Sequence, residues 1–167
     1  MRERLLVWFA REGRSFPWRE LEGRGLSHSM STSVTHDPWL ILVSEVMLQQ
    51  TQASRVATRI GPFMDEYPDP RSLARASVSE VLMAWRGMGY NSRGLRLREA
   101  AQMIVDRFGG RVPGTYEELR TLPGVGAYTA RAVLCFAFGI DITPVDVNIA
   151  RFLSRVFYGP PGLEHPA

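Results

Sequence analysis

The stretch L-P-G-V-G-A-Y-T-A, residues 122–130, decides the fold class of this chain. Gly124 and Gly126 lie between two segments with helical patterns, at about 115–121 and 127–138. Glycine adopts backbone angles that are closed to other residues, so we expect both glycines to form a tight turn between two helices. The amides of such a turn, with the N-terminus of the next helix, can point at one phosphate oxygen.

This turn has two interpretations. Taken alone, it predicts only a connector between two helices. The leucine before it and the T-A-x-A-V pattern after it favour a hairpin that binds the DNA backbone, where a missing Cβ lets a phosphate come close. The candidate DNA-binding residues of the hairpin are Gly124, Val125, Gly126 and Thr129.

Helical periodicity continues through most of the chain, and no segment alternates convincingly like a β-strand. The sequence therefore predicts an all-α protein with short loops between many short helices. Asp37 and Pro38 suit the N-cap and first position of a helix. Residues 15–19 predict an extended or turn segment around Pro17, and residues 20–36, rich in Ser, Gly and Thr, predict a mobile surface loop. The expected helices cover about residues 3–12, 38–52, 54–67, 70–76, 78–86, 92–108, 115–121, 127–138 and 146–157.

Length and composition exclude several classes of protein. The 167 residues are 45% hydrophobic and 22% charged, which is typical of one globular domain or two small lobes. The longest apolar run, residues 39–43, is far shorter than the roughly 20 residues that span a membrane. The N-terminus lacks the pattern of a signal peptide. We therefore expect a cytoplasmic protein with access to the nucleoid and no membrane partner.

Two absences narrow the chemistry further. Cys135 is the one cysteine, which excludes an internal disulfide, a structural zinc site and a four-cysteine cluster within this chain. All 20 basic residues are arginine, so a mechanism through a lysine Schiff base is excluded. The formal net charge of +3 fits a polyanionic partner, although genome composition explains the exclusive use of arginine at least as well.

Two carboxylates are candidates for catalysis. Asp146, in P-V-D-V-N-I-A-R, stands at the start of a helix, where it suits an ordinary N-cap. The helix dipole would also keep it ionised there, so it could stabilise a developing positive charge. Glu45 interrupts an apolar helix and faces either solvent or the core. If it is buried, its pKa rises and it suits a general acid.

Four motifs in order carry a resemblance to a known family. They are S-E-V-M-L-Q-Q-T at 44–51, G-M-G-Y-N-S-R at 87–93, L-P-G-V-G-A-Y-T-A at 122–130 and P-V-D-V-N-I-A-R-F-L-S-R at 144–155. Together they resemble the helix–hairpin–helix DNA glycosylase superfamily, which includes endonuclease III, and most of all its adenine-specific, MutY-type branch. The resemblance covers nearly the whole chain except residues 20–36.

The resemblance implies roles for three catalytic candidates. Glu45 matches the acid that protonates the adenine ring. Asp146 matches the aspartate that stabilises the sugar cation or its covalent adduct and helps to activate the attacking water. Tyr128 stands where enzymes that also cut the strand carry a catalytic lysine. In this respect the chain resembles a monofunctional glycosylase.

The resemblance also implies contacts with DNA and with the target base. Gln50 and Tyr90 match residues that wedge into the base stack. Arg14, Trp18 and Arg19 match a segment beside the base pocket. Without the resemblance, Trp18 and Tyr90 read as core aromatics, Gln50 as a polar surface residue and the two arginines as solvated.

The implied activity is hydrolysis of the N-glycosidic bond of adenine mispaired with 8-oxoguanine or guanine. The substrate would be double-stranded DNA that contains the mispair, and the enzyme would act as a monomer without strand cleavage. One alternative is a mismatch thymine or uracil glycosylase of the same superfamily. A second alternative is a truncated, non-catalytic DNA-binding module.

The implied organisation has three parts. Residues 1–37 would supply an N-terminal helix and loop to a second lobe, 38–138 a helical core with the hairpin, and 139–167 the start of that lobe with Asp146. Members of the family continue into further helices and a four-cysteine 4Fe–4S loop, whose cysteines are absent here. We therefore expect no cofactor and no metal in this chain, apart from a monovalent cation that the resemblance allows at the hairpin. We also expect an incomplete second lobe, marginal stability and weak DNA binding, as for a fragment, a minimal protein or half of an assembly.

Overall fold

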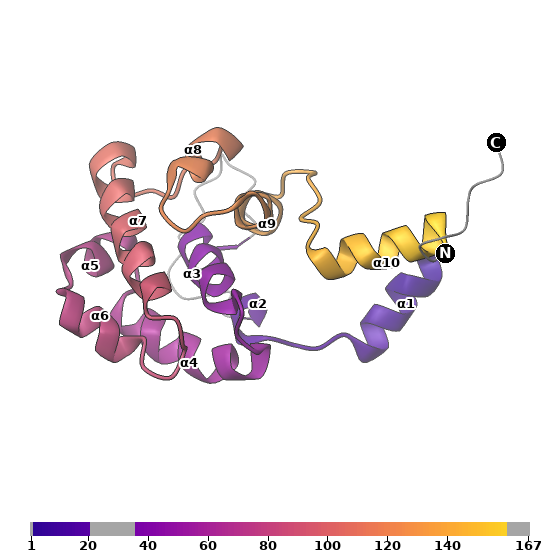
Figure 1. Ribbon diagram of the computed structural model, residues 1–167, viewed down its shortest axis with the longest axis horizontal. Coiled ribbons are helices and arrows are strands. Elements are labelled where there is room, and N and C mark those ends of the chain that lie inside the picture. Colours follow the sequence, from indigo (N-terminus) through magenta and orange to yellow (C-terminus); the bar gives the residue numbers. More distant parts are fainter. Residues whose placement is uncertain (1, 21–35, 160–167) are drawn as a thin grey trace.

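A computed structural model describes residues 2–20 and 36–159. Within these ranges the chain forms helices and no strand, which confirms the all-α class (Figure 1). The candidate loop at 20–36 lies almost wholly outside the described residues. The helices are α1 (Arg2–Glu12), α2 (Pro17–Glu20), α3 (Pro38–Leu48), α4 (Ala53–Glu66), α5 (Pro70–Arg75), α6 (Val78–Ala84), α7 (Ser92–Phe108), α8 (Tyr116–Thr121), α9 (Ala127–Phe138) and α10 (Val147–Tyr158).

Helix α3 is the centre of the packed part of the molecule. It contacts α4, α7 and α9, and Leu42, Val43 and Met47 are completely buried along it. The remaining helices of the core pack in pairs, α5 and α6 on α7 and α8 on α9. Burial of this kind stabilises a fold by about 25 cal/mol for each Å² of apolar surface removed from water. The helices packed around α3 therefore hold the hydrophobic core.

The start of α3 agrees with its sequence signals, and its end does not. Asp37 is the N-cap, where its Oδ1 accepts a hydrogen bond of 2.9 Å from Trp39 N, and Pro38 follows at the first position. The helix ends at Leu48, four residues before the predicted end, because Gln49, with a φ of −57° and a ψ of 112°, leaves the helical conformation and Gln50 has a φ of 54°. The predicted turn around Pro17 was also wrong, since Pro17 begins the short helix α2.

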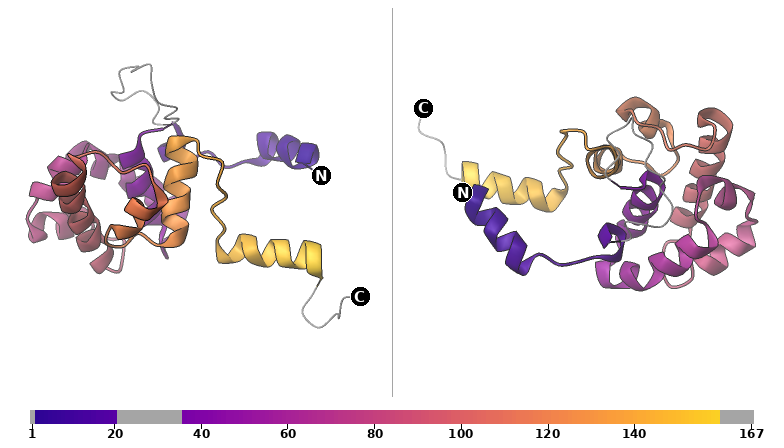
Figure 2. Two further views of the ribbon diagram at one scale, coloured as in Figure 1. Left: turned by 90° about the horizontal axis from the view of Figure 1, so that it is seen from above. Right: turned by 180° about the vertical axis from the view of Figure 1, so that it is seen from behind.

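Helices α1 and α10 project away from the packed helices (Figure 1), and a second view shows that they do not lie against each other (Figure 2). Both expose large apolar side chains: Leu6 and Trp8 of α1, and Phe152 and Phe157 of α10, are each more than half exposed. The division of the chain into a core and a second lobe stays a prediction. No helix in the described ranges is long and apolar enough to cross a membrane.

Candidate functional site

The glycine hairpin joins α8 to α9 and places Gly124, Val125 and Gly126 in one turn, with Thr129 in the first turn of α9. Val125 N donates a hydrogen bond of 3.1 Å to the carbonyl oxygen of Leu122, which closes the turn. Gly124 has a φ of 79°, so the expectation of a glycine-only conformation is confirmed there. The same expectation was wrong for Gly126, whose φ of −82° and ψ of 175° are open to any residue.

Gly126 instead matters for the space around it. It is the N-cap of α9 and supplies no side-chain acceptor to the first turn of that helix. A Cβ on Gly126 would meet no atom within 4 Å, so this surface is open to an approaching ligand. The side chains of Val125 and Thr129 are buried, and their predicted contact with DNA stays a prediction.

The turn after α3 is tied to the hairpin. The side-chain amide of Gln49 donates a hydrogen bond of 3.2 Å to the carbonyl oxygen of Gly124 and one of 3.4 Å to Thr129 Oγ1. Gln50 follows in an exposed, left-handed conformation. The residue predicted to wedge into the base stack is therefore attached, through its neighbour, to the predicted phosphate site.

A second turn, between α6 and α7, presents Tyr90. Tyr90 is 67% exposed, so its interpretation as a core aromatic was wrong. Gln50 and Tyr90 are the two residues other than glycine with positive φ among those that the structure describes, at 54° and 43°. Such a conformation costs about 1–3 kcal/mol and tends to persist at functional sites, where the surrounding structure holds it in place.

Arg93, at the start of α7, is a residue that the sequence reasoning missed. Its guanidinium is buried among backbone carbonyls from the end of α3 and from the turn between α6 and α7, with Nη1 3.0 Å from Val46 O and Nη2 2.7 Å from Met88 O. Burial lowers the pKa of this guanidinium from its ordinary value. An arginine in the first turn of an amphipathic helix reads as a solvated charge, so the sequence carries no signal of its burial.

The structure decides between the two orientations that the sequence left open for Glu45. Its side chain lies in α3 and is 8% exposed, so it faces the interior rather than solvent. Helix α9, which begins at the hairpin, packs directly against α3. A buried carboxyl group in this position is compatible with the predicted general acid, and that catalytic role stays a prediction.

Asp146 and Tyr128 each lie at the start of a helix, Asp146 before α10 and Tyr128 in the first turn of α9. Asp146 is the N-cap of α10, where its Oδ1 accepts a hydrogen bond of 2.7 Å from Ile149 N, so the capping interpretation is confirmed. The helix that Asp146 caps, α10, projects away from the packed helices (Figure 1). Tyr128 is 37% exposed in the first turn of α9. Their catalytic roles stay predictions.

The segment predicted beside the base pocket has one buried and one exposed member. Trp18, in α2, is 5% exposed and belongs to the hydrophobic core. Its ring stacks on Phe16 with centroids 4.7 Å apart, and the guanidinium of Arg14 lies 5.2 Å from the Phe16 ring. The side chain of Arg19 lies outside the described part of the chain. The base-pocket role of these residues stays a prediction.

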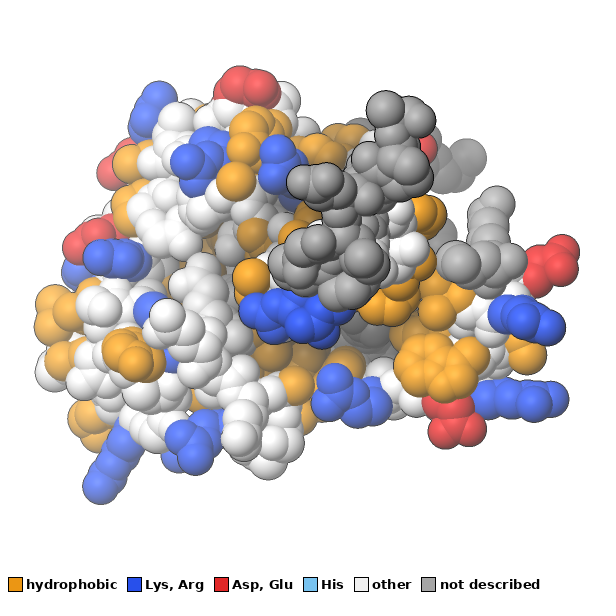
Figure 3. Space-filling view, turned by 45° about the vertical axis from the view of Figure 1, so that its right-hand side comes forward, with side chains coloured by type: hydrophobic (Ala, Val, Ile, Leu, Met, Phe, Trp, Pro, Cys, Tyr) orange, Lys and Arg blue, Asp and Glu red, His pale blue; other side chains and the backbone are white. Residues whose placement is uncertain are grey.

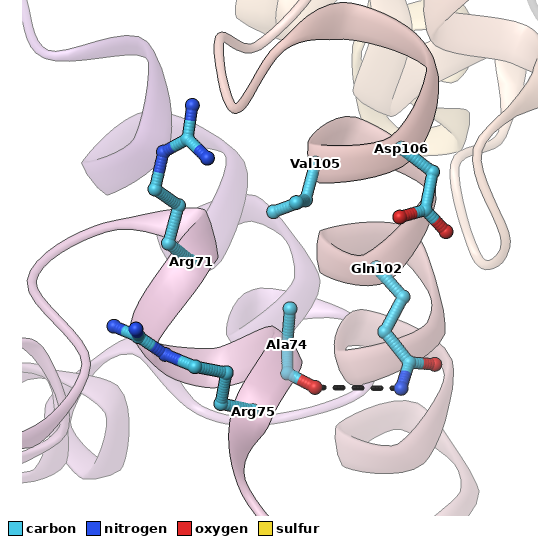
Figure 4. A pocket seen from close by; sticks show the side chains of 6 residues that line it. All are labelled: Arg71, Ala74, Arg75, Gln102, Val105 and Asp106. Carbon is cyan, nitrogen blue, oxygen red and sulfur yellow. Dashed lines mark hydrogen bonds between the residues drawn. The ribbon is translucent and has the colours of Figure 1, made fainter.

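A separate pocket of about 570 Å³ lies between α5 and α7 (Figure 4). Arg71 and Arg75 line it from α5, and Gln102 and Asp106 line it from α7. The amide of Gln102 donates a hydrogen bond to Ala74 O at its edge. This pocket contains none of the predicted site residues, so the candidate site is the surface around the hairpin and the two strained turns.

The hairpin between α8 and α9, set in an all-helical core, defines a helix–hairpin–helix protein. A family model of the HhH-GPD superfamily base excision DNA repair proteins matches residues 43–162. The chain belongs to this superfamily.

Sequence relatives place the chain near adenine-specific members of the superfamily. It is 44% identical over 155 residues to the adenine DNA glycosylase of Mycobacterium tuberculosis, which covers 93% of this chain and 47% of the relative. Identity to the human adenine DNA glycosylase is 44% over 153 residues, or 91% of this chain and 27% of the relative. The thymine/uracil-DNA glycosylase of Methanothermobacter thermautotrophicus is 33% identical over 156 residues, or 93% of this chain and 64% of the relative. The chain thus spans about half the length of the mycobacterial relative.

Solved structures agree on the fold. A thermostable thymine-DNA glycosylase matches with a TM-score of 0.79 and 31% identity, covering 95% of this chain and 66% of that one. A non-covalent complex of endonuclease III with DNA matches with a TM-score of 0.70 over 98% of this chain and 72% of that one. At 21% identity the second likeness shows the fold alone.

The residues of this chain do not fit the iron–sulfur cluster that the resemblance implies for the family. The cluster needs four cysteines, and Cys135 is the one cysteine, half-buried in α9. Within residues 2–20 and 36–159, no group of three or more histidine, cysteine, aspartate and glutamate side chains could hold a metal ion. The monovalent cation at the hairpin stays a prediction.

Proposed function

We propose that this chain carries the activity of a monofunctional adenine DNA glycosylase, with adenine opposite 8-oxoguanine or guanine in duplex DNA as its substrate. The observation that carries the proposal is the burial of Glu45 in α3. A purine is a poor leaving group until a ring nitrogen is protonated, so a carboxylic acid held inside the protein has a direct use. The adenine DNA glycosylases at 41–44% identity support the choice of base.

The proposed reaction begins with extrusion of the adenine, because the glycosidic bond cannot be attacked inside the duplex. Gln50 and Tyr90 would fill the space that the base leaves. Glu45 would donate a proton to the base. As the bond between sugar and base breaks, the sugar gains positive charge, which the carboxylate of Asp146 would stabilise while water attacks.

The approach of Asp146 to the reacting sugar is part of this proposal. Glu45 lies inside α3, whereas Asp146 begins a helix that leaves the packed core. Tyr128, in the place of a catalytic lysine, and the lack of any lysine in the chain support hydrolysis without strand cleavage.

Charge supports DNA as the partner. The formal net charge is +3, and the face drawn in Figure 3 carries more arginine than acidic side chains. A positive surface attracts the phosphate backbone regardless of sequence. We further infer that the chain acts as a monomer at the nucleoid.

A panel of duplexes under single-turnover conditions tests the proposal. The target base is adenine opposite 8-oxoguanine or guanine, thymine opposite guanine, or uracil opposite guanine, and the products are analysed with and without alkali. We expect free adenine, with strand breaks only after alkali treatment. Release of thymine or uracil instead would establish the second candidate, which the 31% identity to the thymine-DNA glycosylase structure favours.

Two other results would overturn the proposal. Strand cleavage without alkali would show a lyase activity. Binding to every duplex with no release of any base, and with binding unchanged by Asp146→Asn, would identify a non-catalytic DNA-binding module.

A further inference from the structure

We propose that Arg93 is a positioning residue that holds the turns of Gln50 and Tyr90 together, so that both side chains enter the base stack in register. The inference rests on the proposed function, because it assigns these two exposed side chains to DNA. It concerns a residue that lies behind them rather than one that touches DNA. The side chain of Arg93 is 7% exposed.

One arm of the guanidinium binds the end of α3. Arg93 Nη1 donates hydrogen bonds of 3.0 Å to Val46 O and 3.0 Å to Met47 O. These are carbonyls near the C-terminus of a helix, where backbone acceptors have no partner within the helix and a cation is favourable. Arg93 thereby binds the C-terminal end of α3, directly before the turn that carries Gln50.

The other arm binds the second turn and joins it to the first. Arg93 Nη2 donates to Met88 O at 2.7 Å and to Gly89 O at 3.2 Å, next to Tyr90. The same nitrogen donates to Thr51 Oγ1 at 2.9 Å, and Thr51 Oγ1 in turn donates to Met88 O at 3.2 Å. The guanidinium carbon also lies 5.9 Å from the centre of the Tyr90 ring.

The chemistry of the contact explains why arginine stands here. The five hydrogen bonds of its guanidinium described above all go to carbonyl or hydroxyl oxygens, so none of them pairs the buried charge with a carboxylate. A planar fork of five donors can reach both turns at once, which a lysine ammonium cannot. Two left-handed residues on adjoining turns are strained, and a rigid cross-link between the turns keeps them in that conformation.

The test compares Arg93→Lys with Arg98→Lys. Arg98 also donates to a backbone carbonyl, that of Ala76, but away from the two turns, so its variant is the matched control. A duplex with 2-aminopurine in place of the target adenine reports extrusion by its fluorescence, and anisotropy reports binding to an undamaged duplex. A duplex with the target adenine opposite an abasic site removes the need to break a base pair.

For Arg93→Lys we expect the fluorescence rise at saturating protein to be largely lost and base release from the mispair to fall about tenfold or more. Binding to the undamaged duplex should change less than about twofold, since phosphate contacts dominate it. Release from the unpaired adenine should recover most of the loss. Arg98→Lys should leave all of these unchanged.

If Arg93→Lys does not fold, Thr51→Val is the second variant that tests the proposal. It removes the hydroxyl shared by both turns, and we expect the same pattern with a smaller loss. Equal fluorescence and release in wild type and folded variants would overturn the role of Arg93. A wild-type protein that binds DNA without any fluorescence rise would instead overturn the proposed function.

Discussion

Gln49 Nε2 lies 3.2 Å from the carbonyl oxygen of Gly124, so the turn that ends α3 is joined directly to the glycine hairpin. The two residues are far apart in the sequence, and neither contact partner is charged. One side chain thereby connects the turn that carries Gln50 with the turn whose amides we expect to face a phosphate. We therefore expect this contact to couple binding of the DNA backbone to entry into the base stack.

Replacing Gln49 should therefore weaken DNA binding. Gln49→Leu removes the donor to Gly124 O and Thr129 Oγ1, and we expect stability to fall by about 1–2 kcal/mol and duplex affinity to fall several-fold. The matched control is Gln102→Leu, which loses a comparable bond to Ala74 O far from the hairpin. Fluorescence anisotropy gives both affinities. Equal losses in the two variants would refute the coupling.

The two glycines of the hairpin should respond differently to a methyl group. Gly124→Ala places a Cβ at a φ of 79° and 3.3 Å from Arg96 Cβ, so it should lower the free energy of unfolding by about 1–2 kcal/mol. Gly126→Ala meets open space at an ordinary φ, so stability should change by less than about 0.5 kcal/mol. Its methyl group should nevertheless block the phosphate and weaken DNA binding. Urea unfolding and anisotropy separate these effects; unaltered binding by folded Gly126→Ala would argue against a phosphate there.

Relief of backbone strain at Gln50 should separate stability from activity. Glycine adopts a φ of 54° without steric cost, so Gln50→Gly should leave the free energy of unfolding equal or raise it by up to about 1 kcal/mol. Base release should fall, because the wedge is gone. Thermal unfolding and single-turnover kinetics give the two quantities. A more stable variant with full activity would show that Gln50 has no part in extrusion.

Alkaline pH should destabilise the fold through Tyr67. Burial, with Glu66 beside it, raises the pKa of Tyr67 from 10.0 to about 12. The folded state therefore holds this proton more tightly than the unfolded chain, and the resulting stability is present in full below pH 10.0 and is lost as pH rises toward about 12. The loss is at most about 2.7 kcal/mol. Unfolding of Tyr67→Phe at pH 9 to 12 is the check, since this variant should lose less stability than wild type; parallel curves would contradict the assignment.

The helices that sequence patterns predict most accurately are those with local end signals. Helices α7 and α9 have the predicted bounds because Gly109 and Gly139 take left-handed conformations directly after them. The end of α3 has no such signal. Glutamine is a good helix former, and the helix stops at Leu48 where the distant Arg93 binds its last carbonyls.

The candidate site divides in the same way. The capping role of Asp146 was predicted because it depends on local chemistry, whereas the wedge role of Gln50 and Tyr90 came from the family resemblance and stays a prediction. The motifs did not decide whether Glu45 faces solvent or the core, because a single carboxylate in an apolar helix is compatible with either orientation. They missed Gln49 and Arg93 as connectors, because hydrogen bonds to distant carbonyls leave no pattern in residue type or spacing.

The most direct test of the proposed function is single-turnover release of adenine from a duplex with adenine opposite 8-oxoguanine, by wild type, Glu45→Gln and Asp146→Asn. The account predicts release by wild type and a loss of at least about a hundredfold in each variant, with duplex binding retained. Release that neither substitution slows, or a folded wild-type protein that binds this duplex and releases no adenine, would contradict it.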